Sequence, residues 1–156
     1  MRRARSFHVT NGSIFAGDVI EPGRHSAQYR QFRPGGPMPT PQSISNLLWE
    51  LALEAARVAA TPEKPSRFDS VFAWETLEDA RWFRDHYRSE FGSILEVEFE
   101  ADIPLHRGSF DLITAKHDTA YVDFMGVGAG RYWIEPPTGR VELLIGGPIT
   151  VMGALH

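Results

Sequence analysis

Cysteine is absent from the 156-residue sequence. Its absence excludes disulfides, thiolate zinc sites, iron–sulfur clusters and a cysteine nucleophile. Long apolar runs are missing as well, because no stretch approaches the roughly 20 residues that a transmembrane helix needs. The first eight residues are basic and lack the apolar segment of a secretory signal. We therefore expect a cytoplasmic protein that does not enter a membrane.

An excess of basic charge is also lacking. The sequence has 16 lysines and arginines against 20 aspartates and glutamates, a net charge of −4. Such a chain is poorly suited to nonspecific binding of duplex nucleic acid. The arginines at positions 2, 3 and 5 are expected to form a frayed, solvated terminus. The length and the hydrophobic share of 42% indicate one globular domain over residues 1–156.

Established metal and nucleotide motifs are not found. The six histidines have no ligand spacing and no His-Glu-x-x-His occurs, so we expect no metal site. Residues 126–130 resemble half of a dinucleotide-binding fingerprint, which needs a strand before it, a helix after it and a further strand. Only 26 residues follow, and Pro136 and Pro137 interrupt them. Residues 126–130 are therefore interpreted as a flexible loop.

The middle of the chain predicts a loop followed by a helix. Residues 31–42 are rich in proline and glycine and are expected to form a loop. Ser43 or Ser45 can cap the helix that follows, and Thr61-Pro62 ends it. Its apolar stripe has helical spacing and comprises Ile44, Leu47, Leu48, Leu51, Ala55 and Val58. Three polar residues are assigned to its solvent-exposed side: Glu50, Glu54 and Arg57.

The rest of the chain predicts a second helix and several strands. Thr76 and Asp79 resemble a capping box at the start of a helix that ends near residue 88. Residues 93–100 alternate between apolar and acidic side chains, which is typical of a strand with one wet face. Further strands are predicted at 7–10, 69–74, 110–115, 141–145 and 149–154. This order predicts an α+β fold with a mainly antiparallel sheet.

A dispersed set of residues remains that can carry chemistry, and it comprises His8, Thr10, Arg67, Phe72 and Glu142. Each has a structural explanation when taken alone. His8 can be a half-buried strand histidine, Phe72 a core residue, and Glu142 an exposed strand end. A common role for the five residues requires that the fold bring them together.

Three stretches resemble the ADP-ribosyltransferase superfamily, which includes diphtheria-type toxins, poly-ADP-ribose polymerases and small rifamycin-modifying enzymes. Phe7-His-Val-Thr10, with Gly17-Asp18 downstream, resembles the first strand and the Gly-Asp segment of small bacterial members. Residues 70–74 and 78–82 resemble the second core strand and the helix behind it. Residues 141–151, Val-Glu-Leu-Leu-Ile-Gly-Gly-Pro-Ile-Thr-Val, are similar to the segment that carries the catalytic glutamate.

The resemblance implies a split, mainly antiparallel sheet with flanking helices, and NAD as the substrate. By the resemblance, Glu142 stabilises the oxocarbenium-like ribose that forms when nicotinamide leaves. His8 would orient NAD and Thr10 would support the same pocket. Phe72 would stack on the nicotinamide ring. Arg67 is free in the sequence to meet a diphosphate oxygen, an inference from its chemistry rather than from a motif.

Three positions depart from the family pattern. Val9 stands where the family usually has glycine, and Phe72 stands where many members have tyrosine. Arg140 lies two residues before Glu142, where arginine-specific transferases carry a second glutamate. The third departure argues against an arginine-specific transferase.

Several functions stay open at this point. The chain can transfer ADP-ribose to a protein, a nucleic acid or a small molecule, or it can hydrolyse NAD. A second alternative is an NAD-dependent RNA 2′-phosphotransferase of the same superfamily, which needs a second histidine and two arginines in the pocket. A third is a non-catalytic binding or regulatory module. The enzyme hypothesis predicts that His8, Phe72 and Glu142 converge on one cleft.

Overall fold

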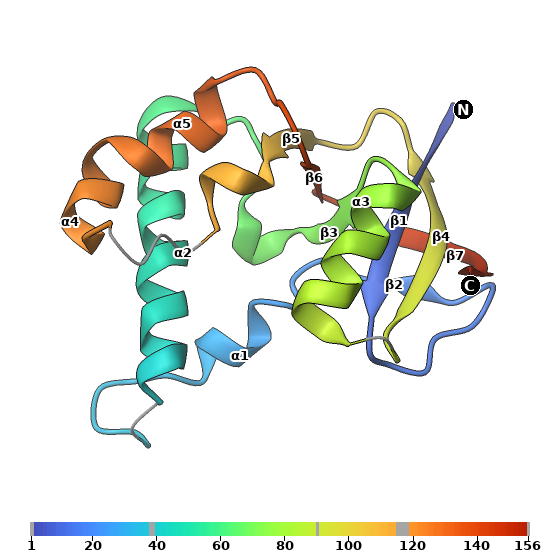
Figure 1. Ribbon diagram of the computed structural model, residues 1–156, viewed down its shortest axis with the longest axis horizontal. Helices are drawn as coiled ribbons and strands as arrows, with labels where there is room; N and C mark the ends of the chain where they lie inside the picture. Colours follow the sequence, from blue (N-terminus) through green and yellow to red (C-terminus); the bar gives the residue numbers. More distant parts are fainter. Residues whose placement is uncertain (1, 38–39, 90, 115–118, 156) are drawn as a thin grey trace.

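The protein is built around one antiparallel sheet. The structure, a computed structural model, describes residues 2–37, 40–89, 91–114 and 119–155. Within these residues seven strands form a sheet in the order β2-β7-β4-β1-β3-β6-β5, and every neighbouring pair is antiparallel. The predicted α+β class with a mainly antiparallel sheet is confirmed. Helix α2 stands to one side of the sheet with α4 and α5, whereas α3 lies across the sheet (Figure 1).

Strands and helices are interspersed along the described chain. The strands are β1 (Arg3–Thr10), β2 (Val19–Ile20), β3 (Val71–Trp74), β4 (Ser93–Glu100), β5 (Leu105–Ser109), β6 (Val141–Ile145) and β7 (Ile149–Leu155). The α-helices are α1 (Ala27–Arg30), α2 (Pro41–Ala60), α3 (Leu77–Phe83), α4 (Tyr121–Asp123) and α5 (Ala129–Ile134). The 3₁₀ and π segments are η1 (Arg67–Asp69), η2 (Arg84–Arg88), η3 (Phe110–Leu112) and η4 (Phe124–Gly128).

The sheet is weakly joined between β1 and β3, a junction that we call the seam. Along the described strands the two pair only at Phe7 and Trp74. In contrast, β1 pairs with β4 over its whole length, from Arg3–Glu100 to Thr10–Ser93. The seam therefore separates β2-β7-β4-β1 from β3-β6-β5. Strands that diverge beyond one pair leave space between them for side chains and a ligand.

Two hydrophobic clusters hold the sheet in place. One contains residues of α2, α3 and α5, including Leu53, Ala80 and Trp133, packed against Trp74 and Ile94 of the strands. The other is formed by residues of the strands and the segments that join them, such as Val71, Leu95, Leu143 and Val151. Because this second cluster draws on both sides of the seam, it joins the two halves where the backbone ladder does not.

The N-terminal arginines belong to the sheet, so the prediction of a frayed terminus is wrong for Arg3 and Arg5. Strand β1 begins at Arg3. The Arg5 side chain lies 3.0 Å from a Glu96 carboxylate oxygen and 3.4 Å from one of Glu98. The glutamates that alternate along β4 thus meet arginines on the neighbouring strand, and such cross-strand pairs of opposite charge stabilise a sheet.

Helix α2 begins inside the segment 31–42 that was predicted as a loop. Thr40 is its N-cap and accepts a 3.1 Å hydrogen bond from the backbone amide of Ser43. Pro41 occupies the first helical position, where its missing N–H costs nothing. The predicted caps Ser43 and Ser45 are therefore wrong. Residues 38 and 39 of the predicted loop lie outside the described residues.

The strand predicted at 110–115 is not found where it was expected. The strand of this region is β5 (Leu105–Ser109), and η3 follows it at Phe110–Leu112. The Phe110 ring makes edge contacts with the rings of Trp74 and Phe83. The apolar character of this segment therefore comes from a turn whose Phe110 ring is buried, and not from a strand. Ala115 lies outside the described residues.

The glycines of residues 126–130 are helical, so the interpretation as a flexible loop is wrong. The chain runs from α4 through η4 into α5 without leaving the helical region. Phe124 and Ala129 are buried, and Phe124 stacks on Trp49 of α2. This packing compensates for the poor helix propensity of glycine.

Helix α2 turns its polar side toward the rest of the molecule, in contrast to the prediction. The Glu50 side chain is only 12% exposed, and those of Glu54 and Arg57 are 25% and 15% exposed. Conversely, Leu51 and Val58 of the predicted apolar stripe are 47% and 57% exposed. The helix instead packs through Ala52 and Leu53, whose neighbours on α5 and η4 the sequence pattern does not reveal.

None of the helices in the described part of the chain combines the length and apolar character needed to cross a membrane.

Gly108 on β5 tests this packing. A Cβ at Gly108 would lie 2.2 Å from the Tyr132 ring, whereas a Cβ at Gly153 on β7 would meet nothing within 4 Å. We expect Gly108→Ala to lower the free energy of unfolding by about 1–3 kcal/mol, the usual cost of overpacking. Gly153→Ala is the matched control and should change stability little. Urea unfolding of both variants is the measurement, and equal stabilities would contradict the packing described.

Candidate functional site

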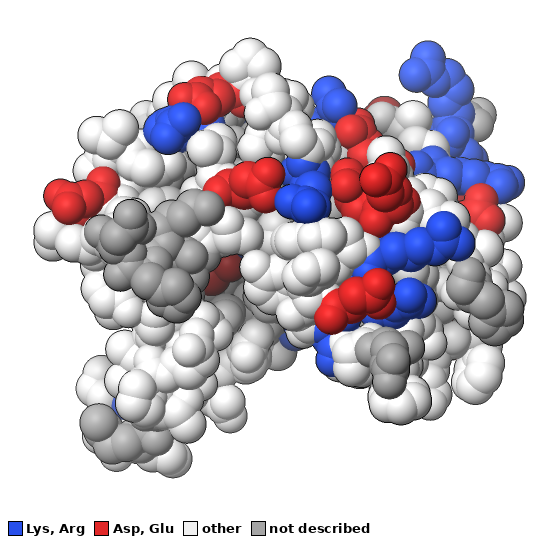
Figure 2. Space-filling model, in the orientation of Figure 1, with Lys and Arg blue, Asp and Glu red and all other residues white. Residues whose placement is uncertain are grey.

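A cleft of about 970 Å³ opens at the seam. This volume is at the upper end of the range for small-molecule sites, roughly 300–1,000 Å³. All five residues singled out from the sequence line it: His8 and Thr10 on β1, Arg67 in η1, Phe72 on β3 and Glu142 on β6. In Figure 2 the surface is hollowed between the helical part and the sheet, and acidic atoms are visible deep in the hollow. The predicted convergence of His8, Phe72 and Glu142 is confirmed.

His8 joins the two sides of the seam. Its Nδ1 lies 2.7 Å from the carbonyl oxygen of Phe72. Because a carbonyl oxygen can only accept a hydrogen bond, Nδ1 carries the proton. In a neutral ring Nε2 is then unprotonated and can accept a hydrogen bond. Burial lowers the pKa of His8, and the charges of Arg24 and Arg88 lower it further against the raising effect of the Phe72 hydrogen bond. His8 is thus a neutral imidazole with a fixed orientation.

Glu142 lies on a strand whose five residues are all buried, and it is itself 5% exposed. Its Oε1 accepts hydrogen bonds from the Arg67 guanidinium and, at 2.7 Å, from the Tyr132 hydroxyl. Within the described residues Oε2 accepts none. The carboxylate is therefore held by one oxygen, and the other remains available to a ligand in the cleft.

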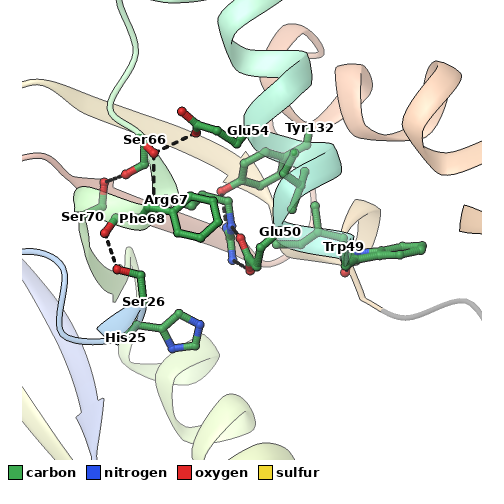
Figure 3. Close-up of polar contacts among 12 residues, drawn as sticks. His25, Ser26, Trp49, Glu50, Glu54, Ser66, Arg67, Phe68, Ser70 and Tyr132 are labelled. Atoms are coloured by element: carbon green, nitrogen blue, oxygen red, sulfur yellow. Dashed lines mark hydrogen bonds and ion pairs between the residues drawn. The ribbon is translucent and has the colours of Figure 1, made fainter. Parts of the chain in front are cut away.

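Arg67 is the centre of a buried polar cluster (Figure 3). Its Nε and Nη2 donate to the two oxygens of Glu50, at 2.8 and 3.1 Å. Its Nη1 donates to Tyr132, at 3.1 Å, and to Glu142. Burial lowers the pKa of Arg67, but the Glu142 and Glu50 carboxylates outweigh burial and raise it well above the usual value. One cation thus faces two carboxylates, which leaves the cluster with a net negative charge.

Tyr132 stays a neutral donor in this cluster. Burial raises its pKa well above the usual value, and the charge of Glu142 raises it further while Arg67 acts in the opposite direction. The hydroxyl proton is therefore retained and directed at Glu142.

A row of serines fixes the short η1 turn that carries Arg67. Ser66 donates to Glu54 on α2 at 2.7 Å and accepts from the Phe68 amide at 3.2 Å. Ser70 donates to the Ser66 carbonyl at 2.6 Å. Ser26 donates to the Phe68 carbonyl from the other side. These contacts, visible in Figure 3, bind η1 to α2, so the backbone that presents Arg67 is held at both ends.

Phe72 provides the aromatic surface of the cleft. The Arg67 guanidinium carbon lies 4.8 Å from the centre of its ring. The His25 ring meets it edge-on with a centroid distance of 4.7 Å. Thr10, at the end of β1, accepts from the Gly12 amide at 3.0 Å and so stabilises the turn at the rim.

The mouth of the cleft carries cations that the sequence did not single out. Arg24 and Arg88 are both exposed residues of its lining, and the charge of each lowers the pKa of His8. Their spacing in sequence gives no motif. The sequence analysis also missed Glu50, Tyr132 and His25. For Glu50 the helical periodicity predicted a solvent-exposed side chain, whereas the side chain is only 12% exposed.

No three His, Asp or Glu side chains of the described ranges gather in a manner that could hold a metal ion.

The chain matches a known sequence family. The profile of DUF2441, described as a protein of unknown function, matches residues 9–156. The chain belongs to the DUF2441 family. No curated protein matches the chain. In this DUF2441 member the matched region holds Arg67, Phe72 and Glu142, whereas His8 directly precedes it.

Removal of the central cation should destabilise this DUF2441 chain strongly. Arg67→Met leaves Glu50 and Glu142 buried without their partner, and breaking a buried ion pair from one side costs about 3–5 kcal/mol. Arg131→Met, which removes the exposed pair with Glu135, is the matched control and should leave the unfolding midpoint unchanged. Chemical unfolding monitored by tryptophan fluorescence is the measurement. Equal midpoints for the two variants would show that Arg67 does not hold the cluster.

Acid should destabilise the fold through His25. Burial, with the charges of Arg67 and Arg88, lowers the pKa of His25 to about 4 against the raising effect of Glu50. The unfolded state then binds a proton that the folded state does not, so stability falls as pH drops from about 6.5 to about 4, by up to about 3 kcal/mol. His25→Phe keeps a ring and should lose less stability over this range. A loss of the same size as in the wild type would contradict the assignment.

Proposed function

We propose that this protein breaks the nicotinamide–ribose bond of NAD, with transfer of ADP-ribose to an acceptor or to water. The observation that carries the proposal is the floor of the cleft, where Glu142 belongs to a buried cluster of net negative charge whose Arg67 guanidinium lies against the Phe72 ring. The seam, the order of the motifs and the resemblance to ADP-ribosyltransferases support the same function.

A negative floor suits the charge that develops in this reaction. When the glycosidic C–N bond breaks, its electron pair leaves with nicotinamide, and positive charge spreads over the ribose carbon and ring oxygen. Preorganised charge aimed at that position lowers the barrier without reorganisation. The Glu142 Oε2 would face the ribose and accept from its hydroxyl. Water or an acceptor then forms the new bond to the ribose carbon and releases a proton.

His8 and Phe72 would orient the substrate. The neutral His8 ring has its Nε2 available as an acceptor for a ribose or carboxamide donor. The Phe72 ring, held by Arg67 and His25, offers an apolar surface for the nicotinamide ring. Thr10 at the rim completes the same side of the pocket.

The diphosphate would bind at the mouth of the cleft. Arg67 was predicted to meet it, but Arg67 already donates to Glu50, Tyr132 and Glu142. Arg24 and Arg88 are better placed, because both are exposed and lie at the rim. Arg67 would then position Glu142 rather than contact phosphate.

An NAD-dependent RNA 2′-phosphotransferase is a second candidate function, because the cleft also holds a second histidine and further arginines. That activity requires a second histidine and two arginines in the pocket. His25, Arg24 and Arg88 line the same cleft as His8 and Arg67. The two candidates differ in the acceptor: the second needs an RNA 2′-phosphate, and the first releases nicotinamide without it.

Glu142→Gln tests the proposed chemistry. Loss of the carboxylate charge should reduce nicotinamide release from NAD by about 10²- to 10³-fold, the usual effect of removing one preorganised electrostatic group. The Gln side chain keeps the hydrogen-bonding shape, so folding should be retained. Glu98→Gln, on the face of β4 that meets Arg3 and Arg5 and not in the lining of the cleft, is the matched control and should keep full activity. The measurement is chromatographic detection of nicotinamide, with NAD binding followed by calorimetry.

The outcomes separate the alternatives. Release that appears only with an RNA carrying a 2′-phosphate, together with loss of that phosphate, would favour the second candidate. NAD binding without release under any acceptor would favour a non-catalytic module. Absence of both binding and release would overturn the proposal.

A further inference from the structure

The side of the cleft formed by α2 differs chemically from its floor and from the opposite rim. Gln42, Asn46 and Glu50 are spaced by four residues and so follow one line along the helix. All three line the cleft, and the line ends at Glu50, which is bound to Arg67. Above Glu50, the described cleft residues of α2 are uncharged. We call these residues the α2 wall: Gln42, Ser45, Asn46 and Trp49.

Two side-chain amides of the α2 wall are coupled to each other. The Gln42 Nε2 donates to the Asn46 Oδ1 at 2.9 Å, and both residues are exposed. This bond leaves one acceptor, the Gln42 Oε1, and one donor group, the Asn46 Nδ2, on two side chains that are in contact. A neighbouring acceptor and donor match the edge of a nucleobase, and glutamine and asparagine amides commonly recognise adenine through its amino group and a ring nitrogen.

An aromatic ring stands next to these amides and is held in place. Tyr121 is 43% exposed and its hydroxyl donates to Ser45 at 2.7 Å. Its ring meets Trp49 at 73° with a centroid distance of 6.3 Å. Trp49 is itself fixed, because its indole donates to the Ile113 carbonyl at 2.8 Å and its face stacks on Phe124. A preorganised, half-exposed ring is a suitable surface for base stacking.

We propose that the α2 wall and Tyr121 form a nucleobase site. The described α2 wall has no cation that could bind a phosphate or carboxylate. The cations of the cleft mouth, Arg24 and Arg88, do not lie on α2. A cationic ligand would find Glu50 already bound in two places by Arg67. The wall therefore suits an uncharged planar group with both a donor and an acceptor.

The base can come from two sources that share this chemistry. One is the adenine of NAD, if the dinucleotide passes from the floor of the cleft, by way of the diphosphate at Arg24 and Arg88, to α2. The other is a base of the acceptor, as a nucleoside or in a single strand. Which of the two sources supplies the base depends on the proposed function. The proposal of a nucleobase site does not depend on it.

Binding of adenosine tests the site without any NAD chemistry. Asn46→Ala should weaken binding about 5- to 10-fold, the loss expected for one hydrogen bond. Asn11 also lines the cleft but follows the end of β1 and does not lie on α2, so Asn11→Ala makes the same change away from the α2 wall and should bind as the wild type does. Tyr121→Leu should weaken binding, whereas Tyr121→Phe keeps the ring and should retain most of it. Purine riboside lacks the amino group from which the Gln42 Oε1 would accept, so it should bind the wild type more weakly than adenosine does, whereas Gln42→Ala should bind the two nucleosides equally. Calorimetry provides the measurement.

The sources are separated with NAD and nicotinamide mononucleotide, which has no adenine. If Asn46→Ala weakens NAD but not the mononucleotide, the site holds the adenine of NAD. If it weakens neither, yet weakens adenosine bound beside NAD, the site holds an acceptor base. Failure of wild-type protein to bind adenosine, or equal binding by Asn46→Ala and Asn11→Ala, overturns the nucleobase site. Adenosine binding without NAD binding would overturn the proposed function alone.

Discussion

The buried guanidinium of Arg67 is the interaction on which the site depends. It binds Glu50 of α2, Glu142 of β6 and Tyr132 of α5, and so joins three elements that are distant in sequence. Burial of any of these charges alone would be costly, and mutual pairing offsets that cost. Because the two carboxylates share one cation, the cluster keeps a negative charge at the floor of the cleft. Structure and chemistry are thus set by the same contacts.

The seam explains why this cluster faces a cleft. A sheet paired evenly from β1 to β3 would bring Val9 and Thr10 into the ladder opposite β3 and close the space between them. Instead the strands separate after Phe7 and Trp74, and His8 reaches the Phe72 carbonyl with its side chain. The strand cluster behind the sheet, with residues from both halves, supplies the cohesion that the ladder lacks there. The opening therefore coexists with a well-packed fold.

Local patterns predicted much of this fold. The alternation over 93–100 and the Thr76 cap both recur in the structure, since each depends on neighbours in sequence. His8, Phe72 and Glu142 were singled out by resemblance and share the cleft. Glu50, Tyr132, Arg24 and His25 were not, because their importance comes from partners distant in sequence, such as Arg67 for Glu50, which lies 17 residues away. No local period encodes such a contact, and the fold supplies it.

The orientation of α2 is the most informative disagreement between sequence and structure. An amphipathic helix is expected to bury its apolar stripe, yet Leu51 and Val58 are exposed while Glu50 and Glu54 are turned inward. Each inward carboxylate has a specific partner, Arg67 for Glu50 and Ser66 with Arg57 for Glu54. Departures from local rules concentrate where function imposes its own demands. Under the proposed function the polar face of α2 is such a departure, because Glu50 holds Arg67 and the exposed amides of Gln42 and Asn46 line the same cleft.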